Sequence, residues 1–157
     1  MLKKIICLLC VILVTGSLTT YAKTLETDNL DSPFIQNIYQ LKNGDFLIEK
    51  RPETVFIHRG TVSGSKQYEY VNSDGIVRWT ATLTGTFTYN GSTATCTAAS
   101  CETSVQQGNW HETYNHAYPS GNTAQADITM VRKVLFITVQ TETAHLVLTC
   151  DANGNLS

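Results

Sequence analysis

One long run of alternating residues constrains the fold of this chain more than any other feature. Over residues 76–89, apolar side chains alternate with threonines, which is the two-residue period of a β-strand with one buried face. We expect the apolar face to comprise Trp79, Ala81, Leu83, Phe87 and Tyr89, and the other face Thr80, Thr82, Thr84, Thr86 and Thr88. Gly85 falls on the apolar face, where its missing side chain indicates a bulge or a close crossing by another strand.

Further strands, separated by turn residues, are predicted along the chain. Their limits are 38–41, 46–49, 66–71, 92–97, 110–118, 123–132 and 139–150. No stretch after residue 22 shows the 3.6-residue apolar period of a helix. Strands with one polar face and regular turn signals are typical of antiparallel sheets packed face to face. The sequence therefore predicts an all-β, Ig-like antiparallel β-sandwich of about seven strands, although Trp79 precedes Cys96 and so departs from true immunoglobulin order.

The first 22 residues have the features of a secretory signal peptide. Lys3 and Lys4 precede a mostly apolar stretch, and Thr20 and Ala22 place small residues at positions −3 and −1 of a cleavage site. The alternative is a transmembrane anchor, but about 14 apolar residues fall short of the roughly 20 that a bilayer requires. We expect cleavage after Ala22, a secreted mature chain, and no stable membrane insertion once the signal is removed.

Composition divides the remaining chain into two parts. Residues 23–64 are predicted to be a polar leader that contains a short hairpin around Asn43 and Gly44, followed by a linker near 51–64. Residues 65–157 are predicted to form the β-sandwich domain.

The charge balance argues against nucleic-acid binding. The chain has 11 basic and 13 acidic residues and a formal net charge of −2. Removal of Lys3 and Lys4 with the signal leaves 9 basic residues against 13 acidic ones and a net charge of −4. A chain of this balance has no general basic field for phosphates, so we expect no nucleic-acid partner.

Signal cleavage also changes the cysteine count. It removes two of the five cysteines and leaves Cys96, Cys101 and Cys150. In an exported chain one pair is expected to be oxidised, and three residues allow three alternative single disulfides. If a strand continues past Thr97, Cys96 and Cys101 lie about 16 Å apart, so only a tight turn between them would permit that bridge.

Motifs for metal, nucleophilic or cofactor chemistry are incomplete in this chain. His111, Glu112 and His116 give H-E-x-x-x-H, one residue longer than the zinc-protease motif, and on a strand the two histidines would point to opposite faces. Cys101 has no helix start or positive neighbour that would activate its thiol. The nearest approach to G-x-S-x-G, at 60–64, has Val62 at its centre. We therefore expect no metal, no cofactor and no catalytic residue.

The strongest candidate for a binding surface is the strand 110–118. Its even positions are Trp110, Glu112, Tyr114, His116 and Tyr118, which would form one row of rings with polar tips. Exposed rings give large contact areas at small entropic cost, so such a row suits a sugar or a protein partner. The alternative is that Trp110 belongs to the core. We take Tyr114, His116 and Tyr118 as the candidate ligand-binding residues.

Several segments resemble a family of small secreted proteins of Gram-positive, gut-type bacteria. They are LKNGDF (41–46), WTATLTGTFTYNGS (79–92), NW (109–110), SGNTA (120–124) and LTC (148–150), with a final Leu-Ser. The resemblance covers roughly residues 40–157 and implies export and an all-β domain, with no assigned activity. It also implies that Cys96 and Cys150 form the disulfide, and that Cys101 is the odd thiol.

These observations favour a secreted, non-enzymatic module that binds an extracellular protein or a glycan. The alternative is a secreted hydrolase or a toxin-like effector whose site is assembled only in the folded chain. A deep pocket lined by perturbed titratable groups would favour the alternative, and a shallow face of rings would favour binding.

Overall fold

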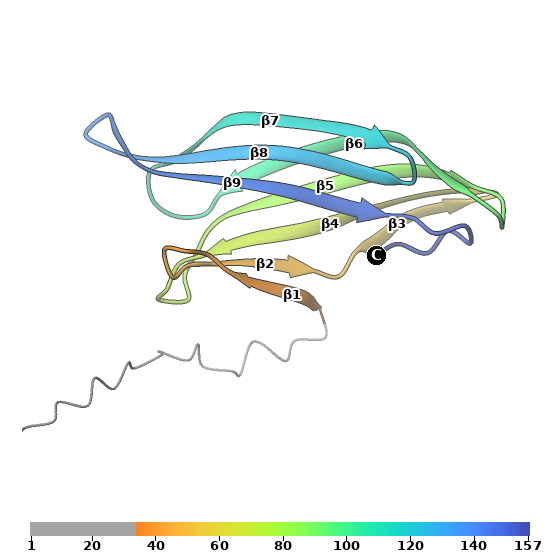
Figure 1. Cartoon of the computed structure of the whole chain (residues 1–157), viewed down its shortest axis with the longest axis horizontal. Coiled ribbons are helices and arrows are strands. Elements are labelled where there is room, and N and C mark those ends of the chain that lie inside the picture. The colour runs from red at the N-terminus through yellow and green to blue at the C-terminus, as the bar shows by residue number, and fades with distance from the viewer. Residues whose placement is uncertain (1–33) are drawn as a thin grey trace, which may run out of the picture.

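A computed structural model describes residues 34–157, which form two antiparallel β-sheets and no helix (Figure 1). The strands are β1 (Ile35–Gln40), β2 (Phe46–Lys50), β3 (Glu53–His58), β4 (Thr61–Val71), β5 (Val77–Tyr89), β6 (Ala94–Val105), β7 (Trp110–Ser120), β8 (Thr123–Val134) and β9 (Ile137–Thr149). Sheet A has the order β1-β2-β4-β5-β6, with β3 also paired to β4, and sheet B has the order β7-β8-β9. The expected β-sandwich is confirmed, with nine strands in this region rather than about seven. The expected signal and the first part of the polar leader, residues 23–33, lie outside the described residues.

The main difference from the expected strands lies at 51–64, where we expected a linker. These residues form β3 and the start of β4, which pair with each other from Glu53 opposite Ser65 to His58 opposite Thr61. Sequence periodicity missed β3 because all six of its residues are exposed, so its apolar residues show no alternation. Gly64 lies inside β4 and does not end it. A glycine is needed there because Leu156 lies over this position, and a Cβ would come within 2.1 Å of the leucine side chain.

Strand β5 has the register that its alternation predicts. Trp79, Leu83 and Phe87 are fully buried, while the intervening threonines are partly exposed on the other face. Gly85 permits the close crossing expected of it, because a Cβ at this position would lie 2.9 Å from the Cβ of Ala124 in β8. Burial of alternate residues against the second sheet thus explains both the strand and its missing side chain.

The two sheets meet on one side and separate on the other. Strands β6 and β7 are consecutive and in contact, and Asn115 donates a hydrogen bond to the Cys101 carbonyl across this side. On the opposite side β9 lies near β4, and the gap is bridged by Tyr68, which bonds to Val147, and by the chain end, where Leu156 lies over Gly64. Ser157 pairs with Thr149 through two backbone hydrogen bonds. Within residues 34–157 no helix is long and apolar enough to cross a membrane.

Candidate functional site

A β-bulge in β7 divides the row of ring residues between two faces. The register pairs Glu112 with Met130 but Tyr114 with Thr129, so Thr113 is the extra residue. Trp110, before the bulge, is buried in the core, whereas Tyr114 is 52% exposed. The expectation of a single row along all the even positions of β7 is therefore wrong, because one inserted residue reverses the two-residue period.

Beyond the bulge, three rings lie along the outer face of sheet B and form what we call the ring stripe: Tyr114, His116 and Tyr118. The ring centroids of Tyr114 and His116 are 6.4 Å apart. Those of His116 and Tyr118 are 5.2 Å apart, with planes inclined by 27°. The structure thus brings the three candidate ligand-binding residues together as neighbours on a solvent-facing surface.

A carboxylate on β8 holds the Tyr118 end of the ring stripe. Asp127 Oδ1 lies 2.7 Å from His145 Nδ1, and Tyr118 also hydrogen-bonds to Asp127. The hydrogen bond with His145 is the main cause of the lowered pKa of Asp127. Desolvation and the charge of Asp127 raise the pKa of Tyr118. At neutral pH the Tyr118 end of the ring stripe therefore has a protonated phenol beside the carboxylate of Asp127.

The same bulge changes the position of the two histidines of H-E-x-x-x-H. His111 pairs with Val131 and His116 with Asp127, so both lie on the outer face rather than on opposite faces. They are separated by about 13 Å of strand, too far to ligate one ion. Among the described residues no group of three or more His, Cys, Asp or Glu side chains could hold a metal ion.

A polar pocket that the sequence did not indicate lies between the sheets, near the β1–β2 and β4–β5 turns. Its volume is about 460 Å³, and its lining includes Asn43, Asp45, Tyr70, Arg78, Trp110, Arg132, Gln140 and Glu142. These residues come from separate strands and turns, and only their tertiary arrangement makes them neighbours. No local spacing could have identified the pocket.

Tyr70 is at the centre of the hydrogen bonds in this pocket. Its ring stacks on Trp79 with centroids 5.1 Å apart and meets Trp110 edge-on at 5.2 Å. Its hydroxyl donates to Asp45 and accepts a 2.7 Å hydrogen bond from Gln140. Burial, followed by the hydrogen bond to Asp45, raises the pKa of Tyr70. The phenol consequently keeps its proton at neutral pH.

The arginines and carboxylates that line the pocket are not paired with each other. Asp45 accepts from Tyr70 and from the Ser73 backbone, and Glu142 accepts from two side-chain amides. In the described part of the chain, neither Arg78 nor Arg132 has a side-chain hydrogen bond or ion pair. The carboxylates are thus occupied by neutral donors, and the two guanidinium groups are available to an anion.

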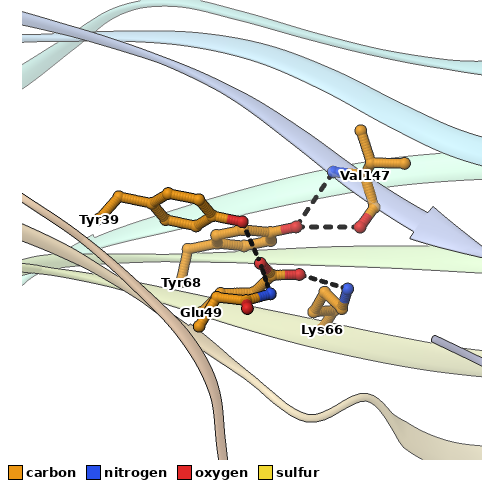
Figure 2. A network of polar contacts seen from close by, with 6 residues as sticks. Tyr39, Glu49, Lys66, Tyr68 and Val147 are labelled. Atoms are coloured by element: carbon orange, nitrogen blue, oxygen red, sulfur yellow. Dashed lines mark hydrogen bonds and ion pairs between the residues drawn. The ribbon is translucent and has the colours of Figure 1, made fainter.

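A buried polar network fills the side on which the sheets separate (Figure 2). Lys66 Nζ lies 2.5 Å from Glu49 Oε1, and Asn37 and Tyr39 donate to the other carboxylate oxygen. Burial opposes ionisation of Glu49, but the hydrogen bonds outweigh it and the pKa of Glu49 is lowered. All charged groups of this network have partners, so we assign it a structural role.

Tyr68 extends this network to sheet B. Its hydroxyl donates to the Val147 carbonyl at 2.9 Å and accepts from the Val147 N–H at 3.1 Å, as Figure 2 shows. Both backbone groups belong to the edge of β9 that faces away from β8. A single phenol thus satisfies part of a strand edge that would otherwise require water or another strand.

The three cysteines are thiols in the structure. Cys96 and Cys101 both belong to the paired strand β6, so their separation of more than about 13 Å excludes a bridge between them. Cys96 and Cys150 are buried neighbours: their N–H groups donate to Gly121 and Asn122, and Cys96 contributes to the raised pKa of Cys150. The Cys96–Cys150 disulfide stays a prediction. Burial, then Glu112 and Glu102, raises the pKa of Cys101 to about 11.

Comparison of the chain with models of protein families, with curated proteins and with solved structures finds no match.

Proposed function

We propose that this protein is an exported, non-enzymatic module that binds an extracellular protein or a glycan through the ring stripe. The observation that carries the proposal is the bulge at Thr113, which turns Tyr114, His116 and Tyr118 outward as one row. Without the bulge, every residue beyond Thr113 would point to the opposite face of the sheet. Rigid aromatic side chains on a solvent-facing sheet bury a large area on binding and lose little entropy.

Polar groups beside the rings support a ligand that carries hydroxyl or amide groups. Asp127 has a lowered pKa and accepts hydrogen bonds as a carboxylate, while the phenol of Tyr118 keeps its proton. Sugar rings combine apolar C–H faces with hydroxyls, and protein surfaces combine apolar and amide groups. Either would match rings that have polar tips.

The alternative hydrolase or toxin-like effector would place its site in the pocket around Tyr70. The pKa shifts of the buried groups favour binding over such chemistry. The pKa of Tyr70 is raised, so at neutral pH its phenol keeps its proton and cannot act as a base. The pKa of the Cys101 thiol is raised to about 11, so little thiolate forms at neutral pH and the group is a poor nucleophile.

The proposal is tested on a glycan array and by pull-down of purified cell-surface proteins. The ligand recovered is then titrated against a Tyr114→Ala/Tyr118→Ala variant and a Phe56→Ala control. Phe56 is a matched control because it is 53% exposed on β3 in the other sheet. We expect the double variant to lose about tenfold or more in affinity and the control to bind like the wild type. Equal binding by all three proteins, or the absence of any ligand, would overturn the proposal.

A further inference from the structure

The β8–β9 hairpin ends in an exposed apolar tip, which we call the apolar tip: Val134, Leu135, Phe136 and Ile137. Phe136 is 99% exposed and Leu135 is 84% exposed. In Figure 1 this hairpin projects beyond the end of the sandwich, where β8 turns into β9. Large apolar side chains gain nothing for stability at such a position, so their presence needs another explanation.

The backbone of the apolar tip is also unfavourable for these residues. Leu135 has φ of 47° and Phe136 has φ of 68°, both in the left-handed region. Two-residue hairpin turns of this kind normally carry Asn-Gly or Asp-Gly, and the turns at Gly44, Gly75 and Gly91 use glycine for positive φ. Retaining Leu and Phe in strained positions indicates a role for their side chains outside the fold.

Three cationic residues lie near the base of the apolar tip, in the sequence or in the adjoining pocket. Lys133 directly precedes it, and Val139 just after it lines the pocket together with Arg78 and Arg132. Both guanidinium groups lack a carboxylate partner among residues 34–157. Asp45 and Glu142 line the same pocket, but they accept hydrogen bonds from neutral groups and leave both guanidinium groups free for an anion. An apolar projection beside such guanidinium groups matches a lipid surface, which is apolar inside and anionic at its boundary.

The shape of the apolar tip favours a lipid surface over a second copy of the chain. Four residues at the end of a hairpin form a small convex projection, whereas a stable dimer buries about 800 Å² per partner. From Val139 to Phe136 the strand extends about 10 Å, which matches the roughly 5–10 Å that interfacial segments penetrate. Arg78 and Arg132 would then lie at the level of the lipid phosphates.

We propose that the protein docks reversibly on anionic lipid surfaces, with Leu135 and Phe136 inserted among the acyl chains and Arg78 and Arg132 bound to lipid phosphates. The contact is peripheral and involves one hairpin end, so it differs from the stable insertion that the sequence argues against. It also uses a surface other than the ring stripe. Either proposal can fail while the other holds.

The test is flotation of the chain 23–157, which retains every described strand, with vesicles of phosphatidylcholine containing about one third phosphatidylglycerol. A Leu135→Asn/Phe136→Gly variant removes both apolar side chains and supplies the residues that the turn prefers. We expect this variant to keep or raise its thermal stability and to lose at least about tenfold in vesicle partitioning. A Val55→Thr/Ile57→Thr control, which removes exposed apolar groups from β3, should partition like the wild type.

A second arm tests the arginines. Arg78→Gln and Arg132→Gln should each weaken binding to anionic vesicles about fivefold, and added salt should reduce the difference from the wild type. A Tyr114→Ala/Tyr118→Ala variant should bind vesicles normally. The proposal is overturned if the wild type does not float with anionic vesicles, or if the Leu135/Phe136 variant floats equally well. It is also overturned if the apolar tip instead supports dimers that this variant abolishes.

Discussion

The space between the two sheets has an apolar half and a polar half, and they differ in what covers them. In the apolar half, Trp79, Leu83 and Phe87 of β5 face buried residues of β8 and β9. In the polar half, Glu49 of β2 and Lys66 of β4 are buried at 6% and 3% exposure. Sheet A has six strands and sheet B only three, so sheet B cannot cover both halves equally. A position of low exposure in this fold therefore does not require an apolar residue.

The physical difference is the supply of hydrogen-bond partners. Under β8, which is the central strand of sheet B, the backbone groups are engaged in pairing on both sides and offer no partners to the side chains of sheet A. At the open side the free edge of β9 offers backbone N–H and C=O groups, and Tyr68 bonds to both groups of Val147. Charged groups can be buried there because every one of them finds a partner.

The largest effect is expected in the apolar half. Phe87→Ala removes a fully buried ring and should lower the free energy of unfolding by about 3–5 kcal/mol. Thr84→Ala, on the outer face of the same strand, should lower it by less than about 1 kcal/mol. Urea titration of both variants checks the difference. Equal losses would mean that β5 has the opposite register.

The predicted Cys96–Cys150 disulfide would further stabilise the apolar half, because it would join the end of β9 to β6. Closing a loop of about 54 residues should stabilise the fold by roughly 4 kcal/mol in the chain-entropy model. Non-reducing peptide mapping should find the two peptides linked, and reduction should lower the unfolding midpoint. Cys101→Ser is the control and should leave that midpoint nearly unchanged. Mapping that joins Cys101 to either partner would refute the assignment.

The polar half should respond differently to single and paired changes. Lys66→Met leaves the Glu49 carboxylate buried without its cation and should cost about 3 kcal/mol. The double replacement Glu49→Leu/Lys66→Met removes both charges and should recover most of that loss. Thermal and urea unfolding of the three proteins measure the coupling. If the double variant is as unstable as Lys66→Met, the loss of stability does not come from an unpaired buried carboxylate, and the prediction is wrong.

Lowering the pH should have a smaller effect on the free energy of unfolding, through Glu49. The folded-state pKa of Glu49 is below its ordinary value of 4.5, so its ionisation stabilises the fold above that pH. This contribution should disappear as pH falls from about 4.5 through the lowered pKa of the folded state. Comparison with Glu49→Gln, whose stability should depend less on pH in this range, isolates the effect. Parallel pH profiles for the two proteins would assign the acid sensitivity to other carboxylates.

The local pattern of the sequence predicts much of the sheet structure but not its irregularities. The alternation around Leu83 gives the correct buried face, and the Asn-Gly and Asp-Gly turns fall between the expected strands. The pattern of β7 predicts one continuous row, because nothing in it signals that Thr113 is the extra residue. A bulge arises from the pairing of two strands, and that pairing is not a property of either strand alone.

By itself, the sequence determined the all-β class and the inward face of β5, because a two-residue period needs no knowledge of distant contacts. Only the tertiary structure decided that Tyr114, His116 and Tyr118 face outward, and that Arg78 and Arg132 line one pocket. It also decided that Lys66 lies inside the sandwich. Each of these outcomes depends on which segments pair or cover one another, and such long-range contacts leave no local spacing in the chain.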